Sequence, residues 1–137
     1  MTVSAGEILY SLLSNSEDVT DLTVLRIYPN LLPQGCAMPA ITYQQISGVR
    51  DYVMGGVTGV AEPSYQVTCW AKTYAGATAL AKVVRELLNC YQGTVSETVV
   101  QLIMLNDEGD IPQFPPETKE LVKYGKRLDF TIWFEES

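Results

Sequence analysis

The sequence predicts a single α+β domain in which about four long strands form a mainly antiparallel sheet, with two helices packed on one face. Apolar and polar side chains alternate over residues 65–71, as in a half-buried strand. Apolar side chains then recur every three or four positions over residues 77–91, as in an amphipathic helix. Each element has an apolar face that needs a cover, and laying the helix across the sheet covers both. The length of 137 residues fits one domain spanning residues 1–137.

A capping box formed by Ser4 and Glu7 predicts the first helix, over residues 4–14. We expect a short turn at residues 15–22, because Asn and Ser end the helical pattern there. A short β-prone piece follows at residues 26–28 and is stopped by a proline.

Residues 29–39 contain three prolines and a glycine, which predict a loop. A strand follows over residues 41–50, but its alternation slips. Either a bulge near Gln44 and Gln45 restores the register, or Ile46 is exposed. Residues 51–63 contain three glycines and a proline and predict a flexible loop between two strands. This loop is unusually apolar, which favours a contact surface formed by Tyr52, Val53, Met54 and Val57.

Thr73 is expected to cap the N-terminus of the second helix, and Gly93 to stop its C-terminus. Residues 97–105 predict a third long strand, and we expect it in the centre of the sheet because both of its faces are largely apolar. The polar residues 106–110 predict a turn. The prolines of residues 111–117 predict an extended or disordered segment.

The last long strand is expected over residues 121–135, with alternating apolar and polar side chains. Trp70 and Trp133 lie on the polar faces of their strands, opposite the expected helices. Two large aromatic side chains are costly to expose, and aromatics are enriched at interfaces. That face is therefore expected to contact a second subunit, or alternatively to be covered by residues 107–120.

The composition excludes several classes of site. The chain contains no histidine, which excludes the Ser-His-Asp and Cys-His mechanisms and every His-ligated metal site. A net charge of −7 argues against broad nucleic-acid binding. Cys36, Cys69 and Cys90 show no disulfide or zinc pattern, and we expect the last two to be small core residues. Without a signal peptide or a membrane span, the chain is expected to fold in a cytoplasm, with no cofactor and no membrane contact.

Two groups of charged residues each admit two interpretations. Asp107, Glu108 and Asp110 could hold a cation, but their spacing matches no calcium loop, which favours a solvated turn. The basic residues near the last strand could form a nucleic-acid patch, but acidic residues interleave them, which favours a solvated or interface face. These basic residues are Lys119, Lys123, Lys126 and Arg127. The glycines of residues 55–59 do not form a P-loop, because neither Lys-Ser nor Lys-Thr follows them.

Five runs of residues, spread over most of the chain, carry a family resemblance. They are Arg26–Pro29, Ile41–Tyr52, Tyr65–Ala75, Ala79–Arg85 and Arg127–Trp133. In this order and near this spacing they resemble the tail-completion proteins of long-tailed bacteriophages, which are also called tail-terminator or tail-to-head joining proteins. Gly76 stands where that family often has an acidic residue, and this difference predicts a weaker N-terminal cap for the second helix.

The resemblance implies a structural virion protein that is not an enzyme. Members of the family form a ring, usually of six subunits, at the head-proximal end of the tail tube. The ring ends tube polymerisation and joins the tail to the neck. The implied partners are further copies of the chain, the tail-tube protein and a head-completion or neck protein. DNA passes through the lumen without sequence-specific binding, and assembly takes place in the cytoplasm of the bacterial host.

We therefore expect subunits to pack through sheet edges and the two tryptophan-bearing faces, while the loops at residues 51–63 and 107–117 reach the tail tube or the neck. The predicted interface residues are Arg50, Tyr52, Val53, Met54, Val57, Trp70, Phe114, Arg127 and Trp133. The alternatives are a small adaptor that binds a partner through its apolar loop, and another head–tail connector or minor tail protein. A carboxylate-dependent enzyme would require acids such as Asp51, Glu62 or Asp129 to converge on a pocket.

Overall fold

The described residues form three helices and eight strands, which confirms the α+β class. The computed structural model describes residues 5–24, 26–30, 37–47, 50–53, 56–95, 98–111 and 124–135. In chain order the elements are α1 (Ala5–Ser14), α2 (Glu17–Thr23), β1 (Ile27–Pro29), β2 (Ala40–Ser47), β3 (Arg50–Val53), β4 (Gly56–Ala61), β5 (Ser64–Ala71), α3 (Tyr74–Leu88), β6 (Tyr91–Val95), β7 (Thr98–Ile111) and β8 (Tyr124–Glu135).

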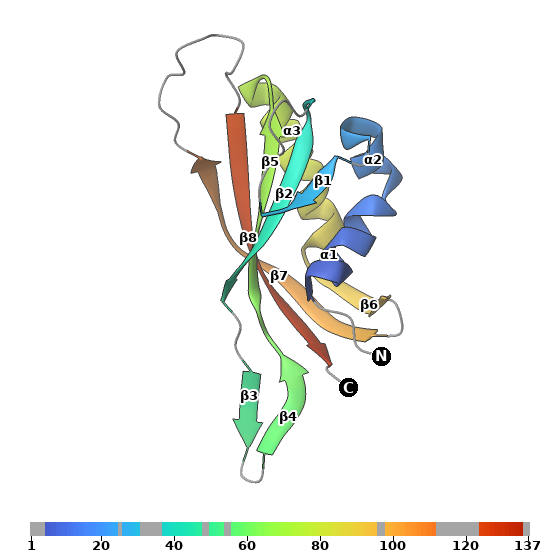
Figure 1. The fold of residues 1–137 in the computed structure, drawn as a ribbon, viewed down its shortest axis with the longest axis vertical. Coiled ribbons are helices and arrows are strands. Elements are labelled where there is room, and N and C mark those ends of the chain that lie inside the picture. The colour runs from blue at the N-terminus through green and yellow to red at the C-terminus, as the bar shows by residue number, and fades with distance from the viewer. Residues whose placement is uncertain are drawn as a thin grey trace.

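All eight strands belong to one curled sheet (Figure 1). β2 and β3 form one interrupted strand, and β4 and β5 form another, because β2 pairs with β5 and β3 pairs with β4. The sheet therefore has six positions, in the order β1, β2–β3, β4–β5, β8, β7 and β6. Among the strands that the structure describes, only the short β1 pairs in parallel. The prediction of a mainly antiparallel sheet is correct, but the predicted numbers, about four long strands and two helices, are lower than the six strand positions and three helices of the described residues.

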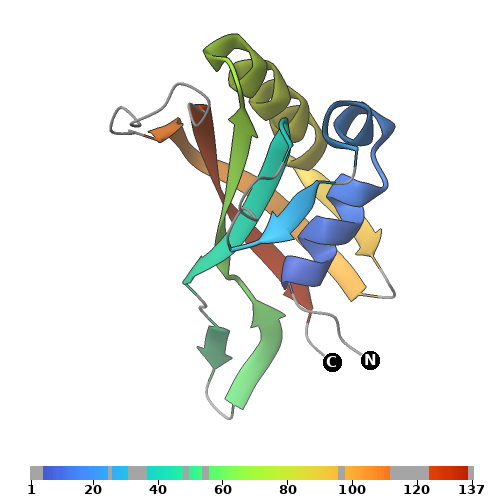
Figure 2. The same cartoon turned by 45° about the horizontal axis from the view of Figure 1, so that its top comes forward.

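The helices cover one face of this sheet (Figures 1 and 2). α3 packs on β5 and β8, while α1 packs on β1 and β2. Alternate side chains of β5 and β8 point into the core, where Val67 lies opposite Leu128 and Tyr65 lies opposite Phe130. Leu80 of α3 is fully buried against this layer. Burying each such side chain stabilises the fold by roughly 1.5–3 kcal/mol.

The start of α3 agrees with the prediction, and its end does not. Thr73 caps the helix, since its Oγ1 accepts a hydrogen bond from the Gly76 backbone N–H at 3.0 Å. The glycine in place of an acidic residue therefore leaves the cap intact. The helix ends at Leu88, and Cys90 turns the chain into β6 with a left-handed φ of 65°. Gly93 lies within β6 and does not stop the helix.

The segment expected to be a turn after the first helix is the helix α2. This seven-residue helix buries the side chains of Val19 and Thr23, which form a short face toward the core. Val24 ends the helix in the left-handed conformation, with a φ of 49°. Its backbone N–H donates a hydrogen bond to the Thr20 carbonyl.

The acidic turn predicted at residues 106–110 is wrong, because β7 continues through it to Ile111. Cross-strand ion pairs with β8 stabilise this extension. The Asp107 carboxylate lies 3.3 Å from the Arg127 guanidinium, and the Asp110 carboxylate lies 3.6 Å from the Lys126 ammonium. A second expectation for this strand also fails, since one face of β7 is open to solvent and Val99 and Met104 are 42% and 45% exposed.

The predicted flexible loop at residues 51–63 is also wrong. β3 and β4 pair as an antiparallel ribbon that extends away from the body of the domain, and we call this ribbon the arm (Figure 1). Val57, Thr58 and Val60 are β-branched and favour a strand despite the neighbouring glycines. In β2, the pairing register with β5 shifts between Gln45 and Ser47, so the bulge lies just past its expected position. Ile46, at this bulge, is 55% exposed.

The cysteines divide between the core and the surface. Cys69 is fully buried on β5, as predicted. Cys90 was expected in the core but is exposed, because the α3–β6 turn directs it away from the helix stripe. Cys36 lies outside the described residues.

Candidate assembly surfaces

The sheet face opposite the helices carries three of the residues predicted to form an interface. Because side chains alternate along a strand, the residues of β5 and β8 that do not enter the core point to this face. Trp70 comes from β5, and Arg127 and Trp133 come from β8, as expected from the sequence. We call this surface the helix-free face.

Trp70 is half-buried within its own chain. Its indole Nε1 donates a hydrogen bond to the Thr42 hydroxyl at 3.0 Å. Its ring lies directly over Gly125, where an added Cβ would stand only 2.7 Å from the Trp70 Cζ3 atom. The missing side chain at Gly125 therefore makes room for the ring on the neighbouring strand.

Trp133 is also half-buried and lies at the root of the arm. Its indole Nε1 donates to the Glu62 carboxylate at 3.0 Å. The adjacent Phe134 pairs with Ala61, where the arm joins β8. Trp70 lies opposite Gly125, which is eight residues before Trp133 (133 − 125 = 8), or about 26 Å at about 3.3 Å per residue. The structure therefore places the two tryptophans at opposite ends of the helix-free face and not in one cluster.

Arg127 lies between the tryptophans and is held by two carboxylates. Its guanidinium is 2.7 Å from the Asp129 carboxylate and 3.3 Å from that of Asp107. Lys126, on the other side of β8, pairs with Asp110. Both basic residues of β8 thus have acidic partners, which agrees with a charge-compensated face and not with a phosphate-binding patch. Lys119 and Lys123 lie outside the described residues.

An apolar strip on the helix-free face was not predicted. Leu102 of β7 lies opposite Trp133, and Met104 lies opposite Thr131. Together with the exposed Val99, these side chains extend the apolar surface around Trp133. The signal in the sequence was the run of apolar residues on both faces of β7, which we interpreted as a sign of a fully covered central strand.

The remaining predicted interface residues belong to segments whose side chains the structure does not describe. Arg50, Tyr52 and Val53 lie in β3, and Val57 lies in β4. Met54 and Phe114 lie outside the described residues. The structure therefore brings Trp133 to the root of the arm, while Trp70 and Arg127 lie further along β8.

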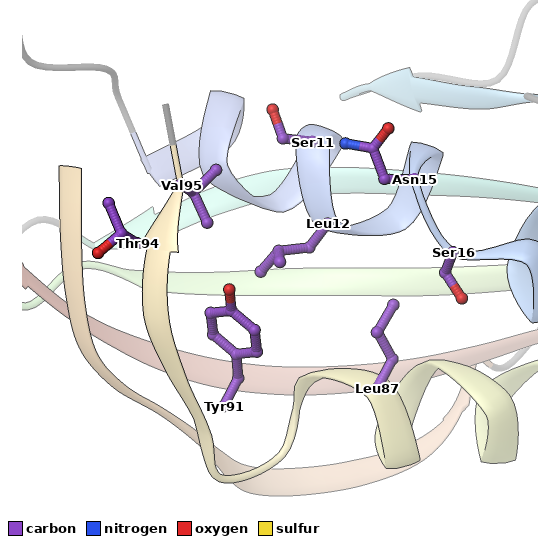
Figure 3. Close-up of a pocket in the computed structure, with 8 residues that line it drawn as sticks. All are labelled: Ser11, Leu12, Asn15, Ser16, Leu87, Tyr91, Thr94 and Val95. Carbon is purple, nitrogen blue, oxygen red and sulfur yellow. The ribbon is translucent and has the colours of Figure 1, made fainter. Parts of the chain in front are cut away.

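A groove between α1, α3 and β6 is a second surface that the sequence did not predict. It has a volume of about 450 Å³. Figure 3 shows Leu12 and the Tyr91 ring pointing toward each other across it, with Leu87 beside them. We call it the α1–β6 groove, and its lining residues are Ser11, Leu12, Asn15, Ser16, Leu87, Tyr91, Thr94 and Val95. It was missed because Tyr91 was assigned to the helix, whereas it begins β6.

The described part of the chain offers little for catalysis. Within it, no group of three or more His, Cys, Asp or Glu side chains could hold a metal ion. Of the candidate acids, Glu62 accepts from Trp133 and Asp129 pairs with Arg127, whereas the side chain of Asp51 is not described. Burial raises the pKa of the Cys69 thiol, which keeps it protonated and unreactive.

Burial also raises the pKa of the Tyr43 and Tyr65 hydroxyls, whose rings both lie beside Gly6 of α1. Both hydroxyls therefore stay neutral near pH 7. None of the helices in the described residues is long and apolar enough to cross a bilayer.

Comparisons with known proteins give a consistent picture. The family model described as "Tail completion protein gp17" matches residues 7–120. A solved structure titled "Virion of native gene transfer agent (GTA) particle" contains a chain of similar fold, with a TM-score of 0.72 and 16% identity. That alignment covers 93% of this chain and 91% of the other. A search of curated protein sequences found no match.

Proposed function

This chain belongs to the tail completion protein gp17 family, and from that premise we propose that it forms a ring at the head-proximal end of a phage tail. It is a structural protein of the bacteriophage virion, located in the tail, and the family implies a structural and not an enzymatic role. In the proposed role the ring contains six copies of the chain, ends polymerisation of the tail tube and joins the tail to the head or neck.

The family match over residues 7–120 is the observation that carries this proposal. The fold shared with a chain of a gene transfer agent particle supports it. The arm and the α1–β6 groove give the chain two different surfaces through which it can contact other copies, the tail-tube protein and a head-completion or neck protein. Contacts between different surfaces of one chain are the kind that close into rings.

The charge of the chain supports the proposed passage of DNA. The net charge is −7, and the basic side chain described on the helix-free face, that of Arg127, is already paired with two carboxylates. Such a surface binds phosphates weakly, because tight binding depends on unpaired Lys and Arg. A lumen built from this protein therefore lets DNA slide through without sequence-specific binding. Assembly takes place in the cytoplasm of the bacterial host.

Tail assembly without the chain tests the proposal. Host cells that produce the other tail proteins but lack this chain should contain tail tubes of uncontrolled length. Adding the purified protein during assembly should restore a uniform length and place a ring at one end, as seen by negative-stain electron microscopy. Tubes whose length distribution does not respond to the protein would overturn the terminator role.

The same experiment separates the neighbouring roles. A protein that binds the ends of finished tails and restores head attachment without changing tube length is a connector and not a terminator. A one-to-one complex with a protein that is absent from the virion would instead identify an adaptor.

A further inference from the structure

The arm has little support from the rest of its own chain. β3 pairs with β4 alone, and β4 meets the body only where Val60 and Ala61 pair with Glu135 and Phe134. In both views the arm points away from the helices and from β6 (Figures 1 and 2). An isolated two-stranded hairpin is marginally stable in water. β3 is also the end of the strand order, so its outer peptide groups have no partner strand among the described residues.

The composition of the arm is unusual for this chain. Beyond Arg50 and Asp51 at its base, the arm is uncharged: residues 52–60 read Tyr-Val-Met-Gly-Gly-Val-Thr-Gly-Val, although the chain has 25 charged residues in 137 (9 basic plus 16 acidic). Two copies of a chain with a net charge of −7 repel each other wherever their acidic surfaces meet. An uncharged segment is therefore suited to contact a second copy.

The α1–β6 groove has the matching property. All eight of its lining residues are uncharged. Leu12, Leu87 and the Tyr91 ring give it an apolar floor, and the polar residues Ser11, Asn15 and Ser16 also line it (Figure 3). By contrast, the groove on the outer side of α3 is lined by Lys82, Arg85, Glu108 and Lys126. Of these two grooves, only the α1–β6 groove can receive an uncharged strand without burying a charge.

We propose that the arm of one copy docks in the α1–β6 groove of a second copy. The inference rests on the proposed ring and names the contact that closes it. The uncharged segment 52–60 lies over the apolar floor of the groove, and polar side chains that line the groove bond peptide groups on the outer edge of β3. Each copy donates one arm and offers one groove, so the contact is head-to-tail and continues from copy to copy until the ring closes.

The test uses one variant for each half of the contact, in the full chain. Leu12→Lys places a charge in the groove, because the Leu12 side chain points into it (Figure 3), and Val57→Lys places one in the arm. Each variant alone should self-associate at least roughly tenfold more weakly than the natural chain, because an unpaired charge is costly to bury. An equimolar mixture should recover one intact contact, between the natural arm of L12K and the natural groove of V57K. Analytical ultracentrifugation should then detect a two-chain species that does not grow further.

Val83→Lys is the matched control for the groove, since Val83 is, like Leu12, a partly buried apolar residue on a helix, but it does not line the groove. This variant should associate like the natural chain, and circular dichroism should show that all three variants are folded. The proposal is overturned if the natural chain stays monomeric at millimolar concentration, if L12K and V83K associate equally, or if the mixture forms no two-chain species. Tube length in the assembly experiment is a separate readout: normal length control by L12K would refute this contact and leave the terminator role standing.

Discussion

Replacement of Gly125 by alanine should destabilise the domain by forcing Trp70 out of its position. The added Cβ would stand 2.7 and 2.9 Å from two atoms of the indole ring and 3.0 Å from the Ile111 Cγ1 atom. Ordinary van der Waals contacts begin near 3.4 Å, so the ring must move by about 0.7 Å. That movement strains the hydrogen bond to Thr42, whose net contribution is about 1 kcal/mol. Overpacking of this kind costs roughly 1–3 kcal/mol, and we expect G125A to lose that amount of unfolding free energy.

Urea denaturation followed by tryptophan fluorescence measures the loss, and a second glycine provides the control. At Gly109 the three atoms nearest to an added Cβ all belong to the Arg127 guanidinium, the closest at 3.0 Å, and a small shift of this group disturbs only surface ion pairs of little energy. G109A should therefore cost less than about 0.5 kcal/mol. In a Trp70→Leu background, G125A should cost at least about 1 kcal/mol less than in the natural chain, because the clash is gone. Equal effects of G125A with and without the indole would refute the reasoning.

Three further predictions concern single sites. Val24→Asn should raise the unfolding free energy by about 0.5–1 kcal/mol, because asparagine tolerates the left-handed φ of 49° that strains a β-branched side chain; a loss of stability in thermal melts would contradict this. Thr73→Ala should lower it by about 1 kcal/mol in urea titrations, because the side-chain acceptor for the Gly76 backbone N–H is lost, whereas Thr73→Asp should retain most of it. Burial raises the pKa of the Cys69 thiol in the folded state above its unfolded value near 8.5. The stabilisation of the fold by the buried neutral thiol is therefore present below about pH 8.5 and declines as the pH rises above that value. Iodoacetamide should accordingly modify the exposed Cys90 in the native protein and Cys69 only after unfolding, and equal native rates at both would show that Cys69 is accessible.

The elements that the sequence predicted well are those in which a local signal and the tertiary contact agree. α3 begins where Thr73 predicts a cap, and its apolar stripe faces the sheet because Leu80 and Val84 recur at helical spacing. β8 shows strict alternation, so both its core face and the outward position of Trp133 followed from the pattern. Helix α2 was missed because seven residues with two buried side chains give almost no periodicity.

The elements that were missed depend on partners far along the chain. Residues 106–110 have the composition of a turn, and their strand conformation comes from backbone pairing with β8, to which the exposed ion pairs with Lys126 and Arg127 add little. The separation of the two tryptophans is a property of the strand register and not of either strand alone. The α1–β6 groove depends on where α3 ends, which is set by the left-handed turn at Cys90 and not by Gly93.

The position of β8 in the sheet has a consequence for the order in which the protein can fold during synthesis. β8 lies between β5 and β7 and pairs with both, although it follows both along the chain. Tyr65, for example, must wait for Phe130, which the ribosome adds 65 residues later (130 − 65 = 65). Until then the edges of β5 and β7 that will face β8 have no partner strand, and such edges promote aggregation of nascent chains. The sheet therefore closes in one late step, when β8 inserts between two strands that are already made.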